Sequence, residues 1–235
     1  MKKLRSINFF AFIAAFLVAS IGYAKADAIL ITSKGDKGTG HTSVISQDKA
    51  GNWHYFFWGI NIAYEATVPL KKVENIDRFN QWLYEWKDPI KGATQIYRTR
   101  DGAMTGFKPS KTQTYYTRGT YIKGDFSETT EYYTEQINSF SKLRYYAGLN
   151  FCSVVSRQAL EKGKLIDGTL FKDLTETYKN VCDRIPFYLD FPVNYHNLVD
   201  RSVKGTVYEG NPEWGDIHNP DVKRFMLNGG TGSSS

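Results

Sequence analysis

The first third of the chain alternates short apolar runs with turn-forming residues. Residues 28–33 (AILITS) form one such run, and the glycine-rich segment KGDKGTG separates them from HTSVISQ and WHYFFWG. The intervening DKAGN contains Gly51 and Asn52, which favour a tight turn. We therefore predict a strand at 28–33, a β-hairpin over 41–59, and a further strand in IAYEATVPL that ends at Pro69.

Helical spacing dominates two segments of the middle region. NIDRFNQWLYEWKD predicts a short amphipathic helix, and SETTEYYTEQINSFSKL predicts another, with Ser127 as its N-cap and acidic residues in its first turn. The apolar positions of the first helix are Ile76, Phe79, Leu83 and Trp86. ATQIYRT and GTYIKGDF favour strands, and the polar residues between them favour a long loop.

A third helix is predicted where the loop RYYAGLN reaches Cys152. Apolar residues share one face of this helix, and Gly163 ends it. They are Val155, Ala159 and Leu160. Asn150 is the expected N-cap, which would put Cys152 in the first helical turn.

These elements predict an α+β fold with an antiparallel sheet packed against helices. One domain is expected over 27–227, with an insertion at roughly 69–119 and a further helix around 169–180. Residues 186–227 are expected to wrap over the core in extended form, and 228–235 to form a flexible tail.

The N-terminus has the organisation of a secretory signal peptide. Basic residues precede the apolar run 9–21, and Ala24-Lys25-Ala26 offers a cleavage site. The run is shorter than the about 20 residues of a membrane span, so no stable span is expected after cleavage. We predict a signal peptide at 1–26, cleavage near Ala26, and export to the periplasm or the exterior.

Removing residues 1–26 changes the charge of the chain. Four of the 30 basic residues and none of the 24 acidic residues lie in that segment, so the net charge falls from +6 to +2. No long basic stretch remains, and nucleic-acid binding is not expected. No H-x-x-x-H, C-x-x-C or Asp-rich loop is present, so neither a metal nor another cofactor is predicted.

The two cysteines, Cys152 and Cys182, support two alternatives. A helix start stabilises a thiolate, which favours Cys152 as a nucleophile with a lowered pKa. An oxidising compartment instead favours a Cys152–Cys182 disulfide in a non-catalytic binding protein.

Histidines supply the proton acceptor that a thiol nucleophile needs. His41 and His54 fall on the two strands of the predicted hairpin, where they are expected to lie close together. Cys152, His41 as base and His54 as the residue that orients it would form a catalytic triad. Alternatively His41 is a polar strand-edge residue and His54 points to solvent. The substitutes for His54 would then be Asn52, Asn61 and Glu65. No chemistry is assigned to His196 or His218.

The stretch GHTSVISQDKAGNWHYFFWG, followed much later by GLNFCSVVSRQALEKG, resembles a known superfamily. It is similar to the circularly permuted branch of the NlpC-type papain-like proteins, which includes the YiiX-like and lecithin:retinol acyltransferase-like proteins. The resemblance covers roughly 38–163 and implies a permuted papain-like fold with His41, His54 and Cys152 as its catalytic residues. The chain departs from the family in the long segment before Cys152 and in Phe151, where some relatives have a polar residue.

Export and this resemblance together suggest a cysteine peptidase or amidase, a hydrolase that cleaves amide bonds in peptidoglycan peptides. A thiol acyltransferase or esterase acting on acyl substrates is the alternative, with strand aromatics available to contact an acyl chain. These aromatics include Phe56, Phe57 and Trp58. The partner is expected to be a cell-wall peptide or an acyl substrate, and the oligomeric state stays open.

Overall fold

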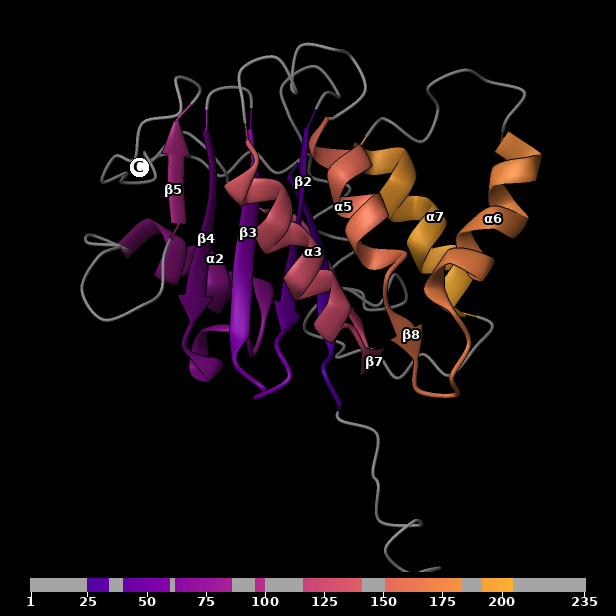
Figure 1. The fold of residues 1–235 in the computed structure, drawn as a ribbon, viewed down its shortest axis with the longest axis horizontal. Coiled ribbons are helices and arrows are strands. Elements are labelled where there is room, and N and C mark those ends of the chain that lie inside the picture. Colours follow the sequence, from indigo (N-terminus) through magenta and orange to yellow (C-terminus); the bar gives the residue numbers. More distant parts are fainter. Residues whose placement is uncertain are drawn as a thin grey trace, which may run out of the picture.

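Six antiparallel strands form the central sheet of the computed structural model, which describes residues 25–33, 40–59, 62–85, 96–99, 116–140, 151–182 and 192–204. The order across the sheet is β5-β4-β3-β2-β1-β6 (Figure 1). The strands are β1 (Ala28–Ser33), β2 (His41–Gln47), β3 (Trp53–Trp58), β4 (Ile62–Val68), β5 (Ile96–Thr99) and β6 (Arg118–Ile122). The predicted strands 28–33 and 41–47 are confirmed.

The hairpin between β2 and β3 is confirmed with its turn at 48–52. The Asp48 carboxylate accepts hydrogen bonds from the backbone N–H groups of Ala50 and Asn52, both at 2.8 Å. Gly51 has a φ of 85°, a conformation that glycine adopts without strain. The turn pairs Gln47 with Trp53, which fixes the register of the whole hairpin.

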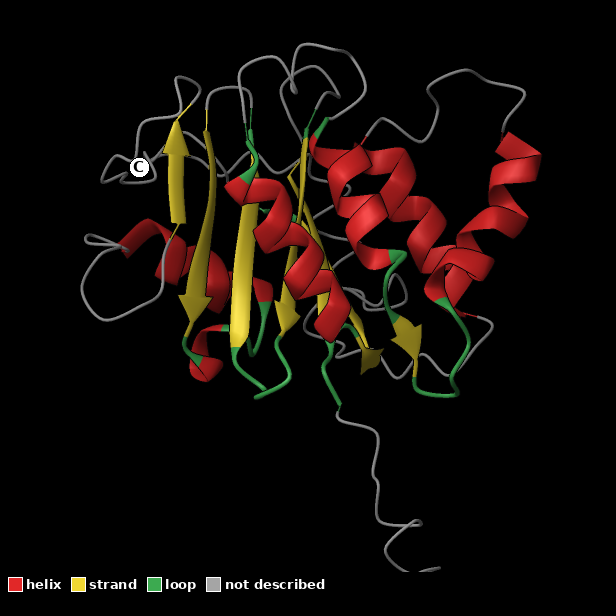
Figure 2. Cartoon of the chain, viewed as in Figure 1, coloured by secondary structure: helices red, strands yellow, loops and turns green. Residues whose placement is uncertain are grey.

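Helices cover both faces of the sheet (Figure 2). They are η1 (Leu70–Lys72), α2 (Ile76–Glu85), α3 (Ser127–Asn138), α5 (Cys152–Leu160), α6 (Phe171–Cys182) and α7 (Pro192–Lys204). The strands β7 (Gly124–Asp125) and β8 (Lys164–Leu165) form a separate two-stranded sheet. The predicted α+β class, with an antiparallel sheet packed against helices, is confirmed.

Two apolar cores result, because alternate strand residues point to opposite faces. On one face, Leu30, Val44 and Phe56 pack against α3, α5 and α7. On the other, Ile45 and Tyr55 pack with α2. Strand β2 contributes to both cores, so its odd-numbered and even-numbered residues have different neighbours.

Helix α7 corrects the predicted extended wrap over 186–227. Pro192 occupies its first position, where a missing N–H costs nothing, and apolar side chains at intervals of three and four face the core. They are Tyr195, Leu198, Val199 and Val203. Residues 205–235 lie outside the described residues.

Two predicted helix caps are also wrong. Phe126, not Ser127, is the N-cap of α3, and the Asp125 carboxylate accepts hydrogen bonds from the backbone N–H and hydroxyl of Ser127. Phe151, not Asn150, is the N-cap of α5. Helix α3 therefore begins one residue earlier than an N-cap at Ser127 would give, and α5 begins one residue later than an N-cap at Asn150 would give.

The segment 69–119, predicted as an insertion, contributes α2 to one face and β5 to an edge of the sheet. The predicted signal peptide lies outside the described residues up to residue 24. Ala26 is buried, donates its N–H to the Gly124 carbonyl and accepts a hydrogen bond from Phe126 N–H. Among the described helices, none has the length and apolar character needed to cross a bilayer.

Candidate active site around Cys152

Cys152 is the first residue of α5 and lies against the beginning of β2. It is a free cysteine, 6% exposed. The hydroxyl of Ser156, one turn further along α5, donates a 3.4 Å hydrogen bond to the Thr42 carbonyl. Because Cys152 is a free cysteine, the Cys152–Cys182 disulfide is not formed in this structure. The side chain of Cys182 lies outside the described residues.

Burial dominates the protonation of this thiol. It raises the pKa of Cys152 above the ordinary value, and the backbone N–H groups of Thr42 and Ser153 oppose it only in part. The predicted thiolate at a helix start is thus wrong for this structure, because desolvation outweighs the helix start. Near neutral pH the thiol keeps its proton, and a base must remove it before the sulfur can attack.

His41 lies on the other face of β2 from α5. Its ring stacks on Phe57, with centroids 4.5 Å apart, and lies 6.2 Å from the ring centroid of Tyr116. Within the described residues its buried Nε2 has no hydrogen-bond partner, so this nitrogen makes no hydrogen bond to Cys152. Burial lowers the pKa of His41 to about 3, so in this position the imidazole is neutral and a weak base.

His54 lies at the far end of the hairpin from His41. It pairs with Ser46, five residues along β2 from His41, a separation of about 17 Å along the strand. Five is an odd number, so the two side chains also point to opposite faces. The expectation that His54 orients His41 is therefore wrong.

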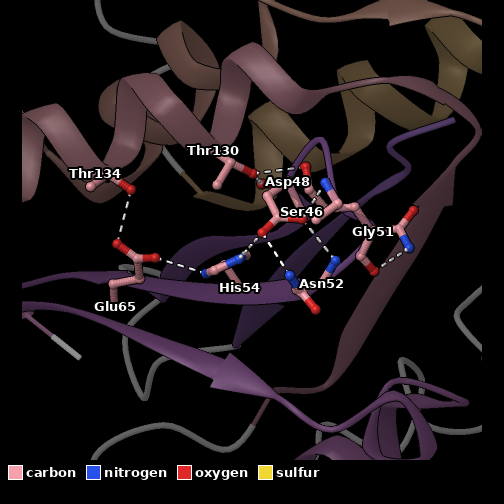
Figure 3. A network of polar contacts seen from close by, with 10 residues as sticks. Ser46, Asp48, Gly51, Asn52, His54, Glu65, Thr130 and Thr134 are labelled. Carbon is pink, nitrogen blue, oxygen red and sulfur yellow. Dashed lines mark hydrogen bonds and ion pairs between the residues drawn. The ribbon is translucent and has the colours of Figure 1, made fainter. Parts of the chain in front are cut away.

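Two carboxylates hold the His54 ring instead (Figure 3). Its Nδ1 lies 2.8 Å from Glu65 Oε1, and its Nε2 lies 3.1 Å from Asp48 Oδ2. The second oxygen of Glu65 accepts a 2.9 Å hydrogen bond from the Thr134 hydroxyl of α3. His54 thus links the hairpin turn, β4 and α3.

This arrangement favours the imidazolium form of His54. Both ring nitrogens must donate to be bonded to two ionised carboxylates, and only the charged ring carries two N–H groups. Burial acts to lower the pKa of His54, but the hydrogen bonds and charges of Glu65 and Asp48 outweigh it and raise the pKa. The same contacts, with Asn52, lower the pKa of Asp48 to about 2 against the opposing effect of burial.

The His54 network predicts a pH-dependent stability. Because its pKa is higher in the folded chain than the ordinary 6.5, its contribution is present below pH 6.5 and is lost as pH rises through the folded pKa. We expect the free energy of unfolding of the wild type to fall with a slope of at most about 1.4 kcal/mol per pH unit. Urea unfolding between pH 6.5 and about 8 measures this slope before most of the Cys152 thiol, ordinary pKa 9.0, titrates in the unfolded chain.

His54→Gln, which cannot titrate, should reduce that slope. Lys49→Ala is the matched control, since it removes an exposed ion pair with Glu131 beside the same turn and leaves the imidazole in place. Equal slopes in His54→Gln and the wild type would contradict the assignment.

Other predicted site residues have different positions. Asn52 bonds the Asp48 carboxylate at 2.9 Å, and Glu65 partners His54. Asn61 and His218 lie outside the described residues. The aromatics considered for an acyl chain are buried in the two cores, so they offer no exposed surface. They are Phe56, Phe57 and Trp58.

His196, to which the sequence assigned no chemistry, is fully buried on the Cys152 side of the sheet. Its Nδ1 lies 2.6 Å from the Thr32 hydroxyl and its Nε2 2.8 Å from the Thr120 hydroxyl. The signal that could have found it is the three-and-four spacing of apolar residues in 192–203, which places residue 196 beside the inward-facing Tyr195 and Val199.

No group of three or more His, Cys, Asp or Glu in the described part of the chain is arranged to hold a metal ion. Comparison with protein-family models, with curated proteins and with solved structures finds no significant match to this chain.

Proposed function

We propose that the chain is an exported cysteine hydrolase with Cys152 as nucleophile, acting on an amide bond of peptidoglycan peptides. One observation carries the proposal: a free thiol at the first residue of α5 lies beside the backbone N–H of Thr42, the residue that follows His41. The order of His41 and Cys152 in the sequence, as in the permuted papain-like proteins, also supports it.

In the proposed reaction, neutral His41 removes the proton of Cys152 as the sulfur attacks the amide carbonyl. Collapse of the tetrahedral intermediate breaks the C–N bond, and the imidazolium returns its proton to the leaving amine. Water then attacks the thioester with His41 again accepting a proton, which regenerates the thiol and releases the carboxylic acid. His41 must first leave its stack on Phe57 and turn around the end of β2 toward α5.

The deciding experiment is hydrolysis of purified peptidoglycan, with products identified by mass spectrometry. Wild-type protein should release peptides that have gained water, and Cys152→Ala should reduce that rate on the order of 10³-fold or more. His41→Ala should cause a loss of similar size, because the thiol keeps its proton without a base.

Cys182→Ala is the matched control, since it removes the other thiol and should leave the rate unchanged. Phospholipid vesicles test the acyltransferase or esterase alternative in the same assay. Turnover of peptidoglycan that is equal in wild type and Cys152→Ala would exclude this thiol as nucleophile.

A further inference from the structure

A polar network crosses the apolar layer between α7 and the sheet. Its central residue is His196, whose two ring nitrogens are hydrogen-bonded to the hydroxyls of Thr32 in β1 and Thr120 in β6. Thr120 also donates a 2.5 Å hydrogen bond to Asp200 Oδ1. Asp200 in turn forms a buried ion pair with Arg118, which donates a 2.6 Å hydrogen bond to Asn197.

The chemistry of these groups fixes the direction of every bond. The Asp200 carboxylate can only accept, so the Thr120 hydroxyl donates to it and its oxygen accepts from Nε2–H of His196. Burial, and then the charge of Arg118, lower the pKa of His196, which keeps the ring neutral. Its Nδ1 therefore accepts from the Thr32 hydroxyl, leaving the Thr32 oxygen free to accept in turn.

The chain of hydrogen bonds continues to the residue beside the thiol. The hydroxyls of Thr32 and Thr42 are 3.5 Å apart on paired residues of β1 and β2. Because the Thr32 hydroxyl donates its hydrogen bond to His196 Nδ1, the Thr42 hydroxyl is the donor of this last bond. Thr42 also accepts from Ser156 of α5 through its carbonyl and directs its N–H at Cys152. Figure 1 shows α5 and α7 side by side next to β2, in agreement with their shared core.

We propose that His196 is a positioning residue for Cys152: through Thr32 it holds Thr42 at the start of β2 against the first turn of α5. The inference rests on the proposed function for its catalytic meaning. In this role the buried imidazole of His196 touches no substrate and acts on Cys152 through Thr32 and Thr42. A fixed tautomer and two bonded hydroxyls give the ring one orientation, and hydrogen bonds in one direction polarise one another.

The test titrates the thiol without any substrate. The ultraviolet absorbance of the Cys152 thiolate is the difference between each protein and the same protein carrying Cys152→Ser. Thr32→Val removes one hydroxyl at nearly constant shape, and we expect it to raise the thiol pKa by about one pH unit, a tenfold loss of thiolate below that pKa. His196→Leu should act in the same direction, whereas Thr32→Ser and His196→Gln keep the bonding groups and should stay near the wild type.

Thr129→Val is the matched control. The Thr129 hydroxyl is equally buried and donates a 2.9 Å hydrogen bond to Ala159, near the other end of α5. It should lower stability and leave the thiol pKa unchanged. A Thr32→Val titration that matches the wild type, or a Thr129→Val shift of the same size, would overturn the positioning role. Absence of hydrolysis by the wild type would instead overturn the proposed function, and the titration would still decide the role of His196.

Discussion

Asp200→Leu is expected to lower the free energy of unfolding by about 3–5 kcal/mol, because it removes the carboxylate that neutralises the buried Arg118 guanidinium. Both residues are nearly inaccessible, at 6% for Arg118 and 7% for Asp200. Arg118 lies at the start of β6 and Asp200 in the middle of α7, so the pair joins an edge strand to a helix. Chemical denaturation monitored by tryptophan fluorescence measures the loss.

A double-mutant cycle shows whether the loss comes from a buried charge that has lost its counter-charge. Arg118→Met should cost a similar amount alone, since it leaves Asp200 unpaired. The double variant should be more stable than either single variant, because no buried charge remains. Losses that simply add would contradict this explanation, and Lys49→Ala, which breaks an exposed pair with Glu131, should leave stability unchanged.

Gly163→Ala is expected to destabilise the protein by about 1–3 kcal/mol or more, the usual cost of overpacking. A Cβ at this position would lie 2.1 Å from a ring carbon of Phe126, which is fully buried and packs edge-on with Phe171. The backbone of Gly163 does not have a positive φ, so alanine is otherwise compatible with it. At a site with the same backbone conformation but with space for a methyl group, a change from glycine to alanine would stabilise the protein by about 0.4–1 kcal/mol.

The steric origin of this effect can be tested with a smaller partner. Phe126→Ala destabilises alone by leaving a cavity, but it removes the Cγ, Cδ1 and Cε1 atoms that the new methyl group meets. Gly163→Ala should therefore cost clearly less in the Phe126→Ala background. A cost that is the same in both backgrounds, measured by thermal unfolding, would exclude the overlap with Phe126 as the cause.

The strands and most helices could be predicted from the sequence because their apolar residues follow a local period. β1 and β2 match the predicted segments residue for residue, and Cys152 lies in the first turn of α5 as expected. Helix α7 was missed because polar residues interrupt its apolar positions, as His196 and Asp200 do. Those polar residues are buried through tertiary hydrogen bonds, which no local pattern contains.

The expectation that His41 and His54 lie close together fails for a different reason. Placing the turn at 48–52 already pairs residue 47 with residue 53, and the register then pairs His54 with Ser46. His41 is five positions further along, on the other face, so careful counting from the sequence would have separated the two histidines. The raised pKa of Cys152 could not be counted in this way, because desolvation depends on the packing of α5 against β2.

The burial of Ala26 determines whether the bond after it can be cleaved before or after the chain folds. A peptidase must bind several residues around the bond that it cuts in extended, accessible form, whereas in the folded chain Ala26 is 0% exposed and hydrogen-bonded on both sides to the segment around β7. Cleavage between Ala26 and Asp27 would therefore have to precede the closure of this edge. Folding and the predicted cleavage would then compete in time, and a chain that folded first would keep residues 1–26.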